Sequence, residues 1–203
     1  MIRLILVRHA VTQWNEEKRY LGITDLPLSN RGKQQAEALA IILMKENIDL
    51  IYSSDLKRAV ETANFIGRDR DTKLISDHRL RELNFGVFEG LTFSDAQDEY
   101  PEMIAAWLKD YNQPPAGGEM LSSLTSRIQS FLDDLRAIEA PKTVLVVTHG
   151  GALREIFRQF LSMPIDKHWS FQFDPASWSE IHVFEDTATV IRANQSHQMR
   201  GDS

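Results

Sequence analysis

The sequence feature that most constrains the fold is a pair of short apolar runs rich in β-branched residues. Each run is followed two residues later by a histidine. The runs at 2–7 and 143–147 are too short for buried helices, so each is expected to be a central strand. Between and after them, helical spacing predicts helices at 29–43, 56–67, 119–138 and 150–161. Strands that alternate with helices predict an α/β fold, a three-layer sandwich with a mostly parallel central sheet flanked by helices.

Shorter segments complete this prediction. We expect strands at 49–52 and 74–76, a helical stretch at 94–111 interrupted by Pro101, a Pro/Gly loop at 112–118, a closing hairpin at 181–184 and 188–191, and a frayed tail from Gln195. Ser53, Ser54 and Asp55 are interpreted as helix-start residues. Because the strand at 143 repeats the buried character of the strand at 2, we predict a single domain over 1–203, with a cap-like insertion at about 94–118.

Composition excludes several classes of protein. With 203 residues and 42% hydrophobic content the chain is long enough for one ordinary core. The 29 acidic and 23 basic side chains give a net charge of -6, which argues against a nucleic-acid partner. The absence of cysteine excludes disulfides, thiolate metal sites and thiol nucleophiles. Neither a signal peptide nor a long apolar span is visible, so we expect a cytoplasmic protein without a membrane partner.

Charged and histidine side chains that can bind a ligand or take part in catalysis follow the predicted strands. In a sheet of this kind ligands bind beyond the carboxyl ends of the strands. Arg8 and His9 follow the first strand, Arg58 belongs to the segment after the second, Glu82 follows the third, and His149 follows the fourth. The helix that begins at Gly150 adds free backbone N–H groups and a positive dipole end. These groups together predict a phosphate site.

The same residues suggest a reaction. Arg8 and Arg58 can each hold phosphoryl oxygens, and their charge favours a neutral imidazole, which is nucleophilic. His9 can then attack phosphorus while His149 donates a hydrogen bond to an equatorial oxygen. Glu82, near Leu80 and Leu83, is the best candidate to give the leaving group its proton and later to activate water.

Four ordered motifs, LVRHAVTQWN, SSDLKRAVETA, LRELNFGVFEG and VLVVTHGG, resemble the histidine phosphatase superfamily, also called the phosphoglycerate mutase-like family. The resemblance covers about Ile2 to Ile156 and is greatest to its alpha-ribazole and broad-specificity phosphatases. It implies a phosphomonoesterase that acts on a small-molecule phosphate ester, such as alpha-ribazole 5′-phosphate, through a phosphohistidine, with no cofactor and no metal. The implied roles are the phosphate acceptor for His9, phosphate-pocket arginines for Arg8 and Arg58, acid/base for Glu82, the second histidine for His149, a phosphate contact for Asn15 and the specificity-loop glycine for Gly22.

Several alternatives stay open at this level. Glu89 is the local rival of Glu82, and Ala10 stands where the family usually has glycine, which would strain the loop if that position needs a positive φ. A phosphoglycerate mutase would use the same five residues, and a non-catalytic phospho-ligand binding module would share the fold. The remaining histidines and Trp107 carry no motif, so we expect packing or surface roles for Trp107, His78, His168, His182 and His197.

Overall fold

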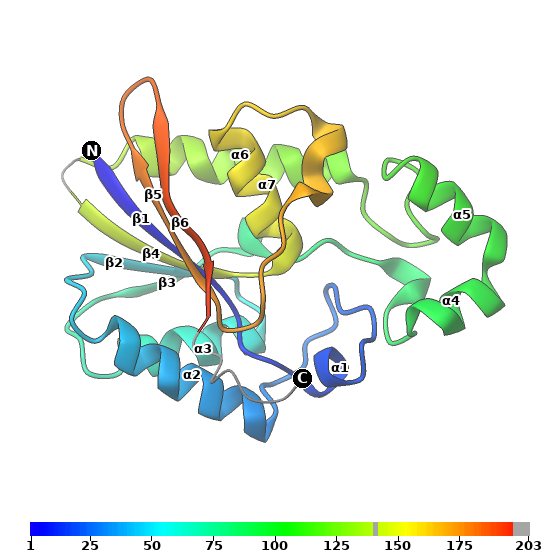
Figure 1. Cartoon of the computed structure of the whole chain (residues 1–203), viewed down its shortest axis with the longest axis horizontal. Helices are drawn as coiled ribbons and strands as arrows, with labels where there is room; N and C mark the ends of the chain where they lie inside the picture. The colour runs from blue at the N-terminus through cyan, green and yellow to red at the C-terminus, as the bar shows by residue number, and fades with distance from the viewer. Residues whose placement is uncertain (140–141, 197–203) are drawn as a thin grey trace.

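The computed structural model describes residues 1–139 and 142–196 and confirms the α/β sandwich (Figure 1). Its strands form a six-stranded sheet in the order β3-β2-β4-β1-β5-β6. The pairs β1–β4, β2–β4 and β2–β3 are parallel, whereas β5 and β6 add an antiparallel edge. The strands are β1 (Ile2–Arg8), β2 (Leu50–Ser53), β3 (Leu74–Ser76), β4 (Lys142–Thr148), β5 (Trp178–Val183) and β6 (Ala188–Gln195).

Helices cover both faces of the sheet. Helices α2 and α3 lie on one face and α6 and α7 on the other, while α4 and α5 lie beyond the sheet (Figure 1). The helices are α1 (Gln13–Glu16), α2 (Asn30–Leu43), α3 (Lys57–Gly67), α4 (Phe93–Glu99), α5 (Pro101–Lys109), α6 (Leu121–Arg136) and α7 (Gly150–Phe160). The segment predicted as an insertion therefore contains α4 and α5, and the domain boundaries stay a prediction.

The alternation of side chains along β1 explains both layers of the core. Leu4 and Leu6 pack into the cluster that contains α6 and α7, and Ile5 and Val7 pack into the cluster of α2 and α3. Successive side chains of a strand point to opposite faces, so an unbroken apolar run is what a strand covered on both sides requires. Arg8 pairs in register with Thr148. The residues that follow these two strands, His9 and His149, therefore emerge together at one edge.

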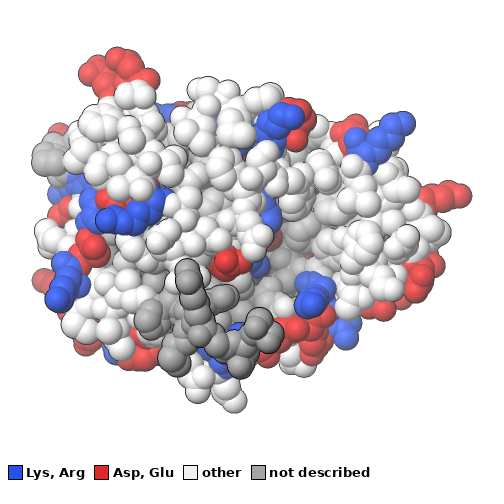
Figure 2. All heavy atoms as spheres, in the orientation of Figure 1, with Lys and Arg blue, Asp and Glu red and all other residues white. Residues whose placement is uncertain are grey.

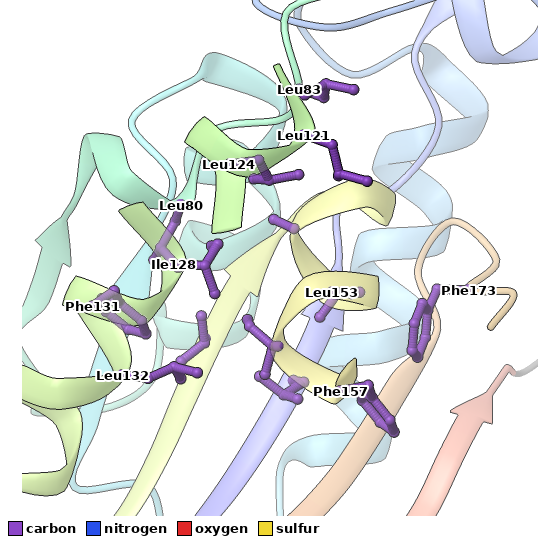
Figure 3. Packing of buried hydrophobic residues seen from close by; sticks show 14 of the residues in the cluster. Leu80, Leu83, Leu121, Leu124, Ile128, Phe131, Leu132, Leu153, Phe157 and Phe173 are labelled. Atoms are coloured by element: carbon purple, nitrogen blue, oxygen red, sulfur yellow. The ribbon is translucent and has the colours of Figure 1, made fainter. Parts of the chain in front are cut away.

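The loop that carries Glu82 is anchored by apolar side chains on either side of it. Leu80 and Leu83 are 0% and 2% exposed and pack with Leu124 of α6 and its neighbours (Figure 3). Burying each leucine contributes about 1.5–3 kcal/mol. This packing holds the segment between β3 and α4 against the sheet, although its regular structure is limited to two short 3-10 helices, His78–Leu80 and Gly86–Phe88.

The predicted interruption of the helical stretch 94–111 at Pro101 is confirmed, because the chain turns at Tyr100 and forms two helices. Some other local predictions need correction. Helix α3 begins at Lys57, and its N-cap Leu56 has no side-chain cap, so the helix-start role given to Ser53, Ser54 and Asp55 is wrong. Strand β6 continues through Gln195, so the tail does not fray there. The rest of that tail from 197, with His197, lies outside the described residues.

Candidate active site

Two histidines from different strands meet at the carboxyl edge of the sheet. His9 follows β1 and is 2% exposed, and His149 is the N-cap of α7 and is fully buried. Their ring centroids lie 5.0 Å apart in an edge-to-face arrangement. The backbone N–H of His9 donates to the carbonyl of Thr148 at 2.9 Å. The pairing of β1 with β4 thus sets the distance between the two imidazoles.

The ring of His9 is fixed in one tautomer. Its Nδ1 lies 2.7 Å from the carbonyl oxygen of Ala10, and since a carbonyl can only accept, Nδ1 carries the proton. Burial lowers the pKa of His9 well below 6.5, and the charges of Arg58 and Arg8 lower it further. The neutral ring therefore keeps an unprotonated Nε2. Nε2 is therefore the ring nitrogen whose lone pair could serve as a nucleophile.

Arg58 ties His149 to the loop after α1. From the first turn of α3, its Nε–H donates to His149 Nδ1 at 3.2 Å, while its two terminal nitrogens donate to the carbonyls of Gly22 and Thr24. The proton of the neutral His149 ring therefore sits on Nε2, which lies 2.8 Å from the hydroxyl of Ser54. Burial, Arg58 and His9, in that order, lower the pKa of His149.

The carboxylate of Glu82 lies at the N-terminus of α7. Both of its oxygens accept the backbone N–H of Gly151 at 3.0 Å, and Oε1 also accepts that of Leu83. A Cβ on Gly151 would stand 2.2 Å from Oε1, so only glycine allows this approach. Arg127 of α6 donates to the main-chain carbonyl of Glu82 at 3.0 Å and supports the loop from behind. The carboxylate is thereby held at the end of α7 that begins directly after His149.

Arg8 lies against Gly150 together with an arginine that sequence reasoning missed. One terminal nitrogen of Arg8 donates to the carbonyl of Phe173 at 2.7 Å, and its Nε is buried without a partner among the described residues. Arg8 Nε and Arg154 Nη1 stand 3.6 and 3.7 Å from the position of a Cβ built on Gly150. The available signal was spacing, because Arg154 is four residues after Gly150 on one helix face.

The rival carboxylate, Glu89, is bonded to a loop. It accepts the backbone N–H groups of Ile23 and Thr24, both at 2.8 Å, that of Phe85 at 3.3 Å, and the hydroxyl of Thr24. A Cβ on Gly22 would stand 2.4 Å from Glu89 Oε1. Glu89 therefore fixes the segment whose carbonyls hold Arg58.

The remaining predicted residues have different surroundings. Asn15 belongs to a capping box, in which its Oδ1 accepts from the backbone and hydroxyl of Thr12 at 3.1 Å. Among the described residues it makes no hydrogen bond to either histidine of the site. Ala10 does not adopt a positive φ, so the backbone strain considered for this position is absent. Trp107 is 3% exposed and packs against aromatic rings, as expected for a core residue.

Other kinds of site find no support in the part of the chain that the structure describes. No group of three or more His, Asp or Glu residues there could hold a metal ion. None of its helices is both long and apolar enough to cross a bilayer. On the face drawn in Figure 2, described acidic and basic side chains alternate around the rim, and they form no continuous basic surface.

Known proteins resemble this chain over nearly all of its length. A model of the histidine phosphatase superfamily (branch 1) matches residues 4–196. Phosphoserine phosphatase 1 of Hydrogenobacter thermophilus is 37% identical over 195 residues, 96% of this chain and 92% of the relative. The adenosylcobalamin/alpha-ribazole phosphatase of Escherichia coli is 32% identical over 93% of this chain and 94% of its own. The alpha-ribazole phosphatase structure from Shigella flexneri superposes with a TM-score of 0.89 at 31% identity, over 95% and 96% of the two chains.

Proposed function

The chain belongs to the histidine phosphatase superfamily and is a phosphoric monoester hydrolase, and we propose that His9 carries the phosphoryl group between ester and water. The observation that supports this role is the tautomer of His9: Nδ1 keeps its proton and donates it in a hydrogen bond to the Ala10 carbonyl, so Nε2 presents its lone pair. An imidazole among buried guanidinium groups stays neutral and nucleophilic at physiological pH. Attack by Nε2 forms a P–N bond as the P–O bond to the alcohol breaks.

The charged side chains around His9 would stabilise the transferring phosphoryl group. Arg8 and Arg58 supply N–H donors to its oxygens, and the N-terminus of α7 at Gly150 adds a backbone donor and the positive helix dipole. His149 moves its Nε2–H bond from Ser54 to an equatorial oxygen. The two guanidinium groups are held by hydrogen bonds to main-chain carbonyls, so they require little reorganisation when charge develops.

Glu82 would handle the proton in both halves of the cycle. As a carboxylic acid it gives its proton to the leaving alkoxide. As a carboxylate it then takes a proton from water, whose oxygen attacks phosphorus while the P–N bond breaks. The products are the alcohol and inorganic phosphate, and both His9 and Glu82 return to their starting states. The position of Glu82 at the N-terminus of α7 supports this assignment.

The substrates are small phosphate esters. Similar proteins bear the names phosphoserine phosphatase and alpha-ribazole phosphatase, and we propose a substrate of that size range for this chain. Mutase activity would use the same side chains, so 3-phosphoglycerate separates the two functions. A phosphatase releases free phosphate from it, whereas a mutase produces 2-phosphoglycerate.

The proposal predicts an acid-labile phosphoenzyme on one residue. The wild-type protein is mixed with 32P-labelled phosphate ester, quenched with base within milliseconds, and mapped by peptide. We expect label on the peptide that contains His9, and none with His9→Ala, which should also lose about 10³-fold or more of its kcat, as nucleophile removal does. Phosphate release by His9→Ala at a rate close to wild type would exclude the phosphohistidine mechanism.

A further inference from the structure

Three arginines at the active site have no carboxylate in direct contact. Arg8, Arg58 and Arg154 are absent from the ion pairs of the described residues, whereas Arg3 and Arg158, for example, each contact a glutamate. The pKa of Arg154 is lowered by burial, with only the field of Glu82 opposing it. A partly buried cation without a counter-ion is costly, so such a cluster is suited to an anion that binds there.

The acidic groups that act on these arginines from a distance are bonded elsewhere. Glu82 binds the backbone of Gly151, and Glu89 binds the backbone of Ile23 and Thr24. Asp174 accepts from the side chains of Gln172 and Asn194, and Asp25 accepts the backbone N–H of Lys57. Only Glu82 among them lowers the cost of the charge on Arg154, and it does so without an ion pair. The proposed mechanism uses Arg8 and Arg58 for the phosphoryl group and leaves Arg154 unassigned.

Arg8 and Arg154 are held side by side by one extended segment. Arg154 Nε donates to the carbonyl of Phe171 at 2.9 Å, and Arg8 Nη1 donates to that of Phe173 at 2.7 Å. Two carbonyls of the same segment, two residues apart, thus fix both guanidinium groups. Both groups also lie close to Gly150, where a Cβ would stand 3.6 Å from Arg8 Nε and 3.7 Å from Arg154 Nη1. The Nη groups of Arg154 donate no hydrogen bond to a described residue.

Trp169 fixes the orientation of Arg154. The guanidinium carbon of Arg154 stands 4.6 Å from the centroid of the Trp169 ring, a cation–π contact at a rim that leaves 36% of the tryptophan exposed. The neighbouring His168 is buried and bonded to Glu155 of α7 at 3.4 Å, which holds this segment against the helix. Since the stacked face of Trp169 is already occupied by Arg154, that face cannot stack on an aromatic base. The geometry favours a charged substrate group over an aromatic one.

We propose that Arg154 binds a second anionic group of the substrate, a carboxylate beside the phosphate, and so selects small carboxylate-bearing phosphate esters. This assignment depends on the proposed function, since it concerns the leaving-group side of the same site. When Glu82 carries its proton, three guanidinium charges face a phosphate dianion, and one positive charge remains for another anion. A carboxylate can accept two parallel N–H bonds from a guanidinium.

The test compares two esters that differ in a single carboxylate. O-phospho-L-serine and O-phosphoethanolamine are assayed for kcat/KM by phosphate release, and as inhibitors of 4-nitrophenyl phosphate hydrolysis. The wild type should prefer phosphoserine. In Arg154→Gln the ratio of the two kcat/KM values should fall about 10- to 100-fold, as expected for the loss of a charged hydrogen-bond pair. Arg154→Lys, which keeps the charge, should recover part of the ratio.

Arg136→Gln is the matched control. That arginine lies at the end of α6 and pairs with Asp133 on the surface, so its replacement should leave the ratio unchanged. Equal use of both esters by the wild type, or an equal loss with both esters in Arg154→Gln, would overturn the carboxylate assignment. In the second case Arg154 serves the phosphoryl group itself. If the wild type hydrolysed neither ester nor 4-nitrophenyl phosphate, both this inference and the proposed function would fail. That outcome is distinguishable from failure of the carboxylate assignment alone, in which the phosphatase activity remains.

Discussion

Replacing each of the two candidate carboxylates by its amide should distinguish them, because activity should depend on the leaving group in Glu82→Gln and should not depend on it in Glu89→Gln. Glu82→Gln keeps an oxygen that can accept the Gly151 N–H but has no proton to give. General acid catalysis contributes about 10²- to 10⁴-fold, which is about 3–5 kcal/mol of barrier. That loss should appear with an alkyl phosphate, whose alkoxide needs a proton. With 4-nitrophenyl phosphate the leaving anion is stable, so phosphoryl transfer should largely survive.

Glu89→Gln should lower kcat/KM by the same factor for the alkyl phosphate and for 4-nitrophenyl phosphate. Its carboxylate holds the loop whose carbonyls bind Arg58, and Arg58 faces the phosphoryl group in the proposed site, which both esters share. Turning one acceptor oxygen into an NH₂ group removes charge-assisted bonds worth about 1.5–3 kcal/mol. The expected fall in kcat/KM is therefore about 10- to 100-fold with either leaving group.

A stopped-flow assay distinguishes the two roles further. Glu82→Gln should release a burst of one nitrophenolate per protein and then turn over slowly, because the base that activates water is also lost. Glu89→Gln should show a slower rate without a burst. The exposed Glu102→Gln in α5 is the control, and thermal melting checks folding. A leaving-group dependence in Glu89→Gln together with none in Glu82→Gln would refute the assignment.

Two further predictions follow from the same contacts. The pKa values of His9 and His149 are held well below 6.5 in the folded state, so the unfolded chain binds more protons below pH 6.5 and the free energy of unfolding should fall as pH drops from 6.5 to 5. Each imidazole contributes up to about 1.4 kcal/mol per pH unit to the slope of the free energy of unfolding against pH. Urea denaturation at each pH measures this slope, which should be shallower in His9→Gln. Gly151→Ala should displace the Glu82 carboxylate, because its Oε1 would lie 2.2 Å from the new Cβ. Turnover of an alkyl phosphate should then fall about 10-fold or more. Retention of wild-type turnover would show that this contact is not needed.

The sequence was sufficient for the parts of the site that follow directly from strand order. The apolar runs at 2–7 and 143–147 predict buried parallel strands, and His9 and His149 come directly after them. Parallel strands that are hydrogen-bonded in register end at the same edge, so the proximity of the two rings required no knowledge of side-chain contacts. Glu82 comes six residues after the strand at 74–76, so strand order alone does not fix its place, and its assignment rests mostly on the resemblance of its motif.

Long-range side-chain contacts account for what the sequence could not predict. Ser54 looked like a helix cap, yet its hydroxyl lies against a ring 95 positions away. Arg127 is one polar residue of an amphipathic helix, and only the packing of α6 brings it to the carbonyl of Glu82. Glu89 lies seven residues after Glu82, and only the fold shows that it binds a loop. Residue type and spacing carry no information about such partners.

The choice of hydrogen-bond partner for His9 connects catalysis to stability. A carboxylate next to Nδ1 would favour the imidazolium and so occupy Nε2 with a proton. The Ala10 carbonyl fixes the same ring orientation without a negative charge. Because burial, and after it the charges of Arg58 and Arg8, disfavour a second proton on the ring, the nucleophile stays available at the pH where it has to act. The same burial and repulsion are the reason that the folded protein must lose stability in acid. One environment therefore determines both the reactivity of His9 and the pH dependence of unfolding.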